Sequence, residues 1–355
     1  MTISETVSDS LAAAQRRSRQ IEREIALGDA DAFRILTGDR PTGHLHVGHY
    51  FGTLANRVRL QDAGAELFVL VADYQVLTDR DSVGHLGEYV TSMVCDYLAA
   101  GVDPAKSVIF AHSAVPELNQ LLLPFLSLVS VGELQRNPTV KAETARSRQS
   151  SVSGLMFCYP VHQAADILAV KANLVPAGQD QLPHVEITRL AARRFNERYG
   201  ATFPEPDTLL SSAPLLLGTD GGKMSKSRGN AIELRATADE TAGLIKRART
   251  DTVREITYDP ANRPEVSSLV LLAALCLDAD PVSVAAGIGS GGAAALKRVV
   301  TEAVNEKFAP LRARRAELAR EPGYVRQVLR DGCEAARSVA TATLTEVRDA
   351  MSMRY

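Results

Sequence analysis

The pattern of hydrophobic and polar positions predicts a layered α/β domain followed by helices. Apolar runs typical of strands lie at residues 34–37, 66–72, 107–111, 173–177 and 215–217. The near-continuous run at 66–72 is typical of a parallel strand buried on both faces. Helical patterns separate the runs, at residues 47–62, 86–100, 117–131, 159–170 and 179–198. This alternation predicts a doubly wound parallel sheet, a Rossmann-like nucleotide-binding domain.

Two flanking regions differ from this central part. Residues 1–31 form a polar N-terminal extension whose second half has a helical pattern. Residues 32–228 are expected to form the catalytic domain. Beyond them every apolar pattern is helical, at residues 238–250, 265–277, 293–319 and 325–351. We therefore expect an all-helical C-terminal domain at residues 229–355, with the last helix free to pack back on the catalytic domain.

Composition narrows the class of protein. The chain has 355 residues, a formal net charge of -2 and four cysteines without a C-x-x-C pair. We therefore expect no structural metal site and no DNA partner, and any nucleic-acid contact requires a local basic patch. No run reaches about 18 apolar residues, and the N-terminus has no secretory signal pattern, so we expect a cytoplasmic protein without a membrane span.

The first segment with recognisable chemistry follows the first predicted strand. It runs Thr-Gly-His-Leu-His-Val-Gly-His from Thr42 to His49 and opens a helix. Backbone N–H groups at a helix start favour phosphate, and His46 and His49 lie on one face of the first turn. Gly48 allows a flat group such as adenine to lie against the backbone. The spacing is not that of a P-loop or of G-x-G-x-x-G. The residues alone leave helix capping or surface solvation as the other interpretation.

The second segment is Lys223–Ser227, which reads Lys-Met-Ser-Lys-Ser, with glycines on both sides. Its two lysines are flexible point charges that suit a phosphate moving during a reaction. Such a loop is able to close over a leaving pyrophosphate. A solvated basic loop is the alternative. Together, the two segments predict that ATP phosphates are held from two sides.

These segments resemble the two hallmark motifs of the class I aminoacyl-tRNA synthetases. Four further runs are similar to tryptophanyl-tRNA synthetases of bacterial type: Val131–Leu134, Ala164–Leu168, Val175–Gln181 and His184–Arg189. The resemblance extends from about residue 33 to the end of the chain. It implies ATP-dependent activation of L-tryptophan to tryptophanyl-AMP, transfer to tRNA(Trp), a requirement for Mg²⁺, and a homodimer with residues 117–131 near its interface.

The resemblance also implies roles for individual residues. Asp166 would accept the indole N–H of tryptophan, unless it is a surface residue paired with Lys171. Tyr159 would line the amino-acid pocket, unless it is a core tyrosine. The other implied tryptophan-binding residues are Gln75, Gln163 and Gln181. The implied catalytic residues are His46, His49, Lys223 and Lys226. The implied ATP-binding residues are Arg40, Pro41, Thr42, Gly48, His49, Gly178, Gln179, Asp180, Leu215, Lys223, Met224, Ser225, Lys226 and Ser227.

Some positions depart from the common bacterial pattern. Gln163 stands where many relatives carry Met, Gln75 where His is frequent, Arg40 where Gln is frequent, and His49 where Asn is common. These changes resemble the auxiliary tryptophanyl-tRNA synthetases that tolerate indolmycin. We keep that subgroup as a hypothesis, which ordinary sensitivity to indolmycin would contradict.

Three other functions remain open at this stage. A tyrosyl-tRNA synthetase shares the fold and mechanism. A tRNA-independent adenylyltransferase would use the same phosphate motifs, but the long helical tail argues against it. A synthetase-like paralogue that senses tryptophan would be indicated by loss of the motif lysines, and both are present. The tail carries twelve basic and eight acidic side chains between residues 297 and 355. Such helices suit a phosphate backbone, and a solvated amphipathic bundle is the alternative. The resemblance to the synthetases favours anticodon binding by the tail.

Overall fold

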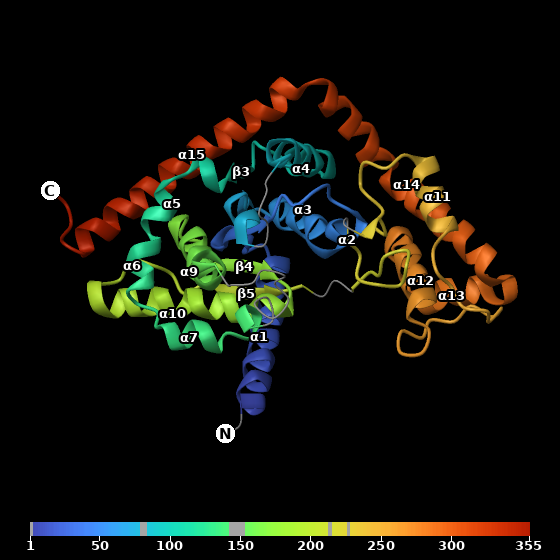
Figure 1. The fold of residues 1–355 in the computed structure, drawn as a ribbon, viewed down its shortest axis with the longest axis horizontal. Helices are drawn as coiled ribbons and strands as arrows, with labels where there is room; N and C mark the ends of the chain where they lie inside the picture. Colours follow the sequence, from blue (N-terminus) through green and yellow to red (C-terminus); the bar gives the residue numbers. More distant parts are fainter. Residues whose placement is uncertain (1–2, 79–83, 142–152, 212–214, 226–227) are drawn as a thin grey trace.

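A five-stranded parallel sheet forms the centre of the molecule, as the computed structural model shows (Figure 1). The structure describes residues 3–78, 84–141, 153–211, 215–225 and 228–355, with side chains from residue 11 onward. The strands are β1 Arg34–Asp39, β2 Glu66–Val71, β3 Ser107–Ala111, β4 Leu174–Ala177 and β5 Asp207–Leu210. Their order is β3-β2-β1-β4-β5, so the chain reverses its direction of winding between β1 and β4. The predicted doubly wound parallel sheet is confirmed.

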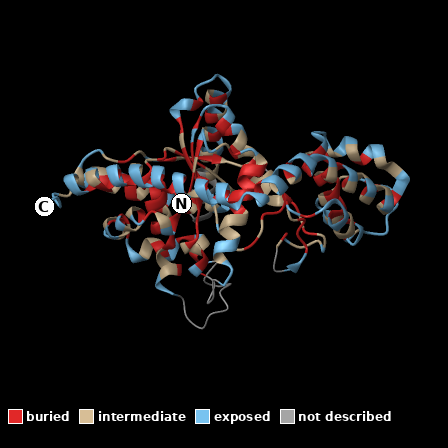
Figure 2. Cartoon of the chain, turned by 90° about the horizontal axis from the view of Figure 1, so that it is seen from above, coloured by how far each residue is buried: buried red, intermediate tan, exposed pale blue. Residues whose placement is uncertain are grey.

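Helices cover both faces of this sheet. In the N-terminal and central parts they are α1 Ile3–Ala26, α2 Val47–His49, α3 Ala55–Asp62, α4 Leu86–Ala100, α5 Glu117–Gln120, α6 Leu122–Leu126, α7 Val131–Arg136, α9 Gly154–Ala169 and α10 Leu182–Tyr199. The C-terminal helices are α11 Ala238–Lys246, α12 Pro264–Leu277, α13 Pro281–Ile288, α14 Gly292–Arg320 and α15 Pro322–Ala350. The strands are buried, while the outward faces of the helices are exposed (Figure 2).

The carboxyl ends of the strands define where a ligand is expected. β1 and β4 are neighbours and lead into helices on opposite sides, and open α/β sheets bind ligands in the crevice at such a switch point. β1 pairs in register with β2 from Arg34 opposite Glu66 to Asp39 opposite Val71. The loop that follows β1 therefore starts beside the segment that follows β2.

A buried ion pair holds the end of β1. The Arg57 guanidinium of α3 lies 2.5 Å from Asp39 Oδ2 and its Nε donates to Thr37 Oγ1 at 3.0 Å. Tyr97 of α4 donates to the same carboxylate at 2.8 Å. Burial raises the pKa of Asp39, but the Arg57 charge and these hydrogen bonds outweigh burial and hold the pKa at about 2. The strand end is thus fixed from two helices before the histidine loop begins.

The N-terminal extension is an ordered helix that packs on the sheet. Ser18 of α1 donates to the Thr208 carbonyl at 3.1 Å and accepts from the Leu210 N–H at 2.9 Å. Ile21 and Ile25 are buried in the core. Because β5 is the last strand in the sheet order, α1 covers an edge that would otherwise expose unpaired backbone groups.

The C-terminal helices form a second lobe and then return to the sheet. α11 and α12 pack on α14, and α14 also packs on α4. α14 and α15 arch over the catalytic domain in Figure 1, and α15 packs on β3. Within the described residues, no single helix has the length and apolar character needed to cross a membrane, although the bent pair Pro264–Leu277 and Pro281–Arg320 meets that test jointly.

Gly332 allows the close contact between α15 and β3. A Cβ at this position would lie 2.0 Å from the Ile109 carbonyl oxygen. We expect Gly332→Ala to destabilise the protein by about 1–3 kcal/mol, because the helix must move away from the strand. Gly323→Ala on the same helix is the control, since a Cβ there meets no heavy atom within 4 Å. Urea unfolding of both variants tests this, and equal stability would show that α15 adjusts freely.

The structure corrects three element predictions. Residues 215–217 are not a sheet strand: Leu217 makes only an isolated bridge to Lys223, and its N–H bonds to Ser268 Oγ of α12. The fifth strand is 207–210, a run of four residues of which two are polar. The predicted helix at 117–131 is interrupted after Gln120, because Pro124 has no N–H to donate to that carbonyl. The short helix α13 was not predicted.

Candidate active site

Loops from the carboxyl ends of four strands surround the switch point. The histidine loop follows β1, Asp73–Gln75 follow β2, His112 follows β3, and Gly178–Gln181 follow β4. α9 brings Asp166 to the same region through its contact with His112. Residues far apart in the sequence thus meet where nucleotide-binding folds of this class hold their ligands.

The two histidines of the first loop cap the start of the same helix, α2. His46 is the N-cap of α2, and its side chain and that of His49 form a reciprocal capping box. His49 Nδ1 accepts from the His46 N–H at 3.2 Å, and the ring centroids are 3.7 Å apart. The sequence left capping and phosphate binding as alternatives, and capping occurs. It also fixes both rings in one orientation, which a phosphate-binding role requires.

The lysine loop packs directly against the histidine loop. The Val47 N–H donates to the Ile232 carbonyl at 3.0 Å, and the Leu234 N–H donates to the Leu45 carbonyl at 2.9 Å. A Cβ on Gly48 would lie 3.5 Å from Met224 Sδ, and Met224 is buried. The histidine loop therefore pairs with residues 232–234, which follow the lysine loop, and lies against Met224 of that loop, although Gly48 and Lys223 are 175 positions apart in the numbering. Lys226 and Ser227 lie outside the described residues.

Asn230 organises the described part of the lysine loop. Its Oδ1 accepts from the Ser225 N–H at 2.7 Å, and its Nδ2 donates to the Lys223 carbonyl at 3.1 Å and to Asp220 Oδ1 at 2.6 Å. The residue is buried, and Gly218 leaves the space for its amide. The Asn230 side chain thus fixes the backbone conformation of the described part of the lysine loop.

We expect Asn230→Ala to lower the adenylation rate by up to about 10²-fold, because small misplacements of catalytic groups have effects of that size. Tryptophan affinity should stay unchanged. The measurement is tryptophan-dependent ATP–pyrophosphate exchange, with Asn262→Ala, an exposed turn residue, as control. A normal exchange rate in Asn230→Ala would show that the loop does not depend on this amide.

Asp166 lies in a buried polar cluster rather than on the surface. It is 1% exposed, and His112 Nε2 lies 2.8 Å from its Oδ1 without the alignment of a hydrogen bond. Neither carboxylate oxygen has a hydrogen-bond partner among the described residues. Lys171, the partner expected for a surface aspartate, pairs with Glu346 instead. A buried carboxylate with unfilled acceptor positions fits the role of accepting an indole N–H.

Two histidines complete this cluster. The His162 and His112 ring centroids are 4.9 Å apart, and His162 Nε2 contacts Asn119 Oδ1 at 2.8 Å. Burial lowers the pKa of His162, which keeps it neutral near pH 7, although Asp166 opposes the shift. The ligand atoms of His112, His162 and Asp166 lie within 4.8 Å of one another, so the set has the composition of a transition-metal site. The sequence-based expectation that the protein has no metal site stays a prediction.

Tyr159 is buried and contacts a second buried histidine. Its hydroxyl is 3.0 Å from His184 Nε2. Tyr159 also packs with Val140 and Met156 in a small apolar cluster of its own. Tyr159 is therefore a core tyrosine, as one of the two interpretations expected. Its contact with a bound amino acid stays a prediction.

His184 predicts a pH dependence of stability. Burial lowers the pKa of His184 from its ordinary value of about 6.5 to about 4. The unfolded chain therefore binds this proton first, and the free energy of unfolding should fall as pH decreases from about 6.5 towards 4, at no more than about 1.4 kcal/mol per pH unit. Urea unfolding at several pH values measures this slope. His184→Gln should flatten it between pH 5 and 6.5, and an unchanged slope would assign the proton elsewhere.

The remaining predicted residues occupy varied positions. Arg40 is exposed and donates to Thr78 Oγ1 at 3.4 Å, and the Thr42 N–H bonds to the Arg40 carbonyl. Leu215 is 70% exposed, so its contact with adenine stays a prediction. Those that remain are Pro41, which is buried, Gln75, Gln163, Gly178 and Gln181, which are half-buried, and Gln179, Asp180 and Lys223, which are exposed.

The donor set of the two loops suits ATP phosphates better than a protein-held Mg²⁺. Histidine, lysine and serine donors line the described parts of both motifs. Mg²⁺ prefers oxygen ligands and usually keeps several waters. A Mg²⁺ ion accompanying ATP would therefore be held mainly by phosphate oxygens, with these side chains around it.

The sequence analysis missed four residues of the site. His112 and His162 contact or face Asp166, Asn119 orients His162, and Asn230 holds the lysine loop. Helical spacing was an available signal for His162, which lies four positions before Asp166. The position of His112 directly after a strand was another. Asn119 gave no local signal, because its partner His162 is 43 positions away. The partners of Asn230 lie within ten positions, but no helical or strand periodicity connects residues of that loop.

Comparison with known proteins agrees with this geometry. The family model described as tRNA synthetases class I (W and Y) matches residues 29–309. The chain belongs to this family. It is similar to the tryptophan–tRNA ligase of Thermotoga maritima, with 42% identity over 327 residues that cover 91% of this chain and 100% of that protein. The tryptophan–tRNA ligase of Treponema pallidum is 40% identical, over 90% of this chain and 97% of that protein.

Solved structures of the class I synthetases show the same architecture. The tryptophanyl-tRNA synthetase of Campylobacter jejuni complexed with ADP and tryptophan superposes with a TM-score of 0.77, at 30% identity, over 90% of this chain and 99% of that chain. A tyrosyl-tRNA synthetase of Archaeoglobus fulgidus complexed with L-tyrosine has a TM-score of 0.63 at 22% identity, over 79% of this chain and 90% of that chain. The second likeness concerns the fold alone.

Proposed function

We propose that this chain is a tryptophan–tRNA ligase that activates L-tryptophan with ATP and transfers it to tRNA(Trp). The carrying observation is that the histidine loop pairs with residues 232–234, directly after the lysine loop, and lies against Met224 of that loop. The Asp166 cluster lies at the same ends of the strands, through its contact with His112. This arrangement offers donors for a triphosphate and an acceptor for a ring N–H within one region. The curated relatives described above are tryptophan–tRNA ligases that match nearly their whole length.

The first step joins the two substrates. The tryptophan carboxylate attacks the α-phosphorus of ATP, a new P–O bond forms, and the bond to pyrophosphate breaks. No covalent enzyme intermediate is required, so the protein acts by positioning and charge stabilisation. His46, His49 and Lys223 would stabilise the phosphate charge, together with Lys226. Mg²⁺, when bound with ATP, would neutralise part of the phosphate charge.

The second step transfers the amino acid. A ribose hydroxyl at the tRNA 3′ end attacks the carbonyl carbon of tryptophanyl-AMP, an ester forms, and AMP leaves. The helical lobe supports binding of the rest of the tRNA. A groove between α11 and α14 is lined by Lys246, Lys297 and Arg298, which suits a phosphate backbone. We assign residues 229–355 to anticodon recognition and keep 32–228 as the catalytic unit.

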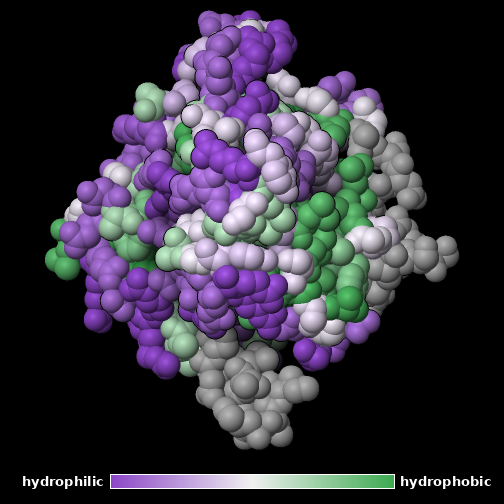
Figure 3. Space-filling view, turned by 90° about the vertical axis from the view of Figure 1, so that its left-hand side faces the viewer, coloured by the Kyte–Doolittle hydropathy of each residue, from purple (hydrophilic) through white to green (hydrophobic). Residues whose placement is uncertain are grey.

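A homodimer is supported by an apolar groove at the end of the molecule. Leu123 of α6 is 75% exposed and lines this groove with Leu344, Val347 and Met351 of the α15 region. Apolar surface gathers on this left-hand face in Figure 3. Solvent-exposed apolar patches of this kind often mark subunit interfaces. Leu123→Arg should shift the mass measured by light scattering towards the monomer, and an unchanged mass would locate the interface elsewhere.

Amino-acid-dependent ATP–pyrophosphate exchange tests the function directly. Tryptophan should support exchange and tyrosine should not, and charging of tRNA(Trp) should follow. Exchange with tyrosine would instead identify a tyrosyl-tRNA synthetase. Tryptophan binding without exchange would identify a sensor. Charging activity in a cytoplasmic extract tests the expected cytoplasmic location. Inhibition by indolmycin tests the auxiliary subgroup, which ordinary sensitivity would contradict.

A further inference from the structure

The helix that precedes the family match carries a row of exposed arginines. α1 lies before residue 29, where the match to the synthetase family begins. Arg16, Arg19 and Arg23 are exposed, and their spacing of three and four residues places them on one face. The row spans about 10 Å of helix. The chain as a whole has a net charge of -2, so this row is a local positive feature.

The two acidic side chains of the helix that the structure describes are engaged with other partners. Glu22 pairs with Arg59 of α3 at 2.8 Å, and Glu24 pairs with Arg17 at 3.2 Å. Within the described side chains, no carboxylate forms an ion pair with any arginine of the row. Three guanidinium groups therefore face solvent with their donors available.

The opposite face of α1 is fixed to the catalytic domain. Ser18 bonds to β5, Ile21 and Ile25 are buried, and Arg17 Nε donates to Asp207 at 2.7 Å. Because the apolar face is already used, α1 has no free apolar side to insert into a membrane interface. A rigid, polar, basic row suits a polyanion bound at its surface.

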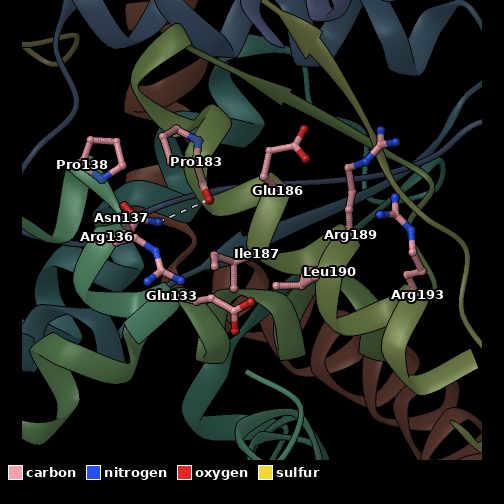
Figure 4. A pocket seen from close by; sticks show the side chains of 10 residues that line it. All are labelled: Glu133, Arg136, Asn137, Pro138, Pro183, Glu186, Ile187, Arg189, Leu190 and Arg193. Carbon is pink, nitrogen blue, oxygen red and sulfur yellow. Dashed lines mark hydrogen bonds between the residues drawn. The ribbon is translucent and has the colours of Figure 1, made fainter. Parts of the chain in front are cut away.

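Further arginines lie near Arg17 of this helix. Asp207, the partner of Arg17, also accepts from Arg189 of α10 at 3.4 Å. Arg189 and Arg193 lie next to each other along α10 and line a groove between α7 and α10 (Figure 4). Arg17, a neighbour of the row along α1, is thus linked through Asp207 to Arg189, while Arg189 and Arg193 also pair with Glu205.

We propose that Arg16, Arg19 and Arg23 form an additional contact surface for the phosphate backbone of the tRNA. The inference rests on the proposed function, which supplies the polyanion. Guanidinium groups bind phosphate in a bidentate manner, and phosphate contacts contribute affinity without sequence specificity. The row therefore strengthens tRNA binding and leaves amino-acid activation unaffected.

The test measures the salt dependence of tRNA affinity. The full chain and the triple variant Arg16→Gln, Arg19→Gln, Arg23→Gln are titrated with a tRNA(Trp) transcript by fluorescence anisotropy. Losing three phosphate contacts should reduce the slope of log K against log salt by about 2–3, so that the loss of affinity between 50 and 200 mM salt is smaller by up to about fortyfold. The matched triple Arg→Lys variant keeps the charge and should keep the slope.

Each other outcome overturns the proposal in a distinct way. An unchanged slope in the Gln variant means that the row does not touch the tRNA. An equal change of slope in the Lys variant means that altered structure of α1, and not loss of positive charge, causes the effect. Arginine-dependent binding to phosphatidylserine vesicles, with a normal tRNA slope, assigns the row to a lipid surface. Tryptophan-dependent exchange, which needs no tRNA, should be normal in all variants, and its absence in the wild type would refute the proposed function instead.

Discussion

Replacing His46 by alanine should lower the rate of tryptophan-dependent ATP–pyrophosphate exchange by about 10²–10³-fold, the usual effect of removing one pre-organised donor from a transition state. His46 is 8% exposed, is the N-cap of α2, and lies in the ladder that joins the histidine loop to residues 232–234. The side chain therefore has a fixed orientation, and we propose that it faces the phosphates of ATP. The Michaelis constant for tryptophan should change little, because the proposed indole acceptor, Asp166, lies on α9.

Two controls separate catalysis from folding. His85→Ala removes an exposed histidine and should leave the exchange rate intact. Tryptophan binding reports on the integrity of the His46→Ala site. The chain contains no tryptophan, so selective excitation of indole detects the bound ligand without a protein background. Exchange within threefold of the wild type would remove His46 from the mechanism. Loss of tryptophan binding as well would indicate a collapsed site.

Replacing Asp166 by asparagine should raise the dissociation constant of tryptophan about tenfold to a hundredfold, because a charge-assisted hydrogen bond contributes about 1.5–3 kcal/mol. The substitution keeps the shape of the side chain but brings an N–H₂ group into a cluster that already contains His112 at 2.8 Å. The affinity for ATP should stay the same, since the proposed nucleotide site is formed by the histidine and lysine loops and not by Asp166. Indole fluorescence measures the first quantity and inhibition of exchange the second.

A methylated ligand makes this test more specific. Tryptophan methylated at the indole nitrogen lacks the donor, and sites built around such a hydrogen bond reject the analogue by up to about 10⁴–10⁵. Wild-type enzyme should discriminate strongly, and Asp166→Asn should discriminate much less. Lys171→Ala is the control, because that lysine pairs with Glu346 on the surface. Equal discrimination by wild type and Asp166→Asn would place the indole elsewhere.

Local patterns were sufficient for most of the fold. The 86–100 helix was predicted with its observed bounds, because Gly101 in a left-handed conformation ends a periodic apolar run. The first four strands were located because continuous apolar runs between helices have few other structural uses. The fifth strand was misplaced for the opposite reason: its sequence Asp-Thr-Leu-Leu is short and half polar, and α1 provides much of its burial.

The candidate site divides in the same way. His46, Lys223 and Asp166 were recognisable because their motifs are local and chemically unusual. His112 and Asn119 were not, because each contributes through a partner that is distant in the sequence. Asn230 was not, because its hydrogen bonds to nearby residues depend on a loop conformation that has no periodic pattern. The departures at Gln75 and Gln163 were visible in the sequence, but both lie half-buried and their effect on the pocket depends on neighbours.

The sequence by itself determined the strand–helix alternation, the two motifs proposed to bind phosphate and the family, since these depend on residue type and spacing along the chain. Only the tertiary structure decided that Leu45 pairs with Leu234, which lies beyond the lysine motif, that Asp166 is buried beside His112, and that α1 covers the edge of β5. The reason is physical: backbone pairing, burial and charge environment depend on tertiary contacts between residues that are distant in the sequence. Local sequence patterns do not specify those contacts.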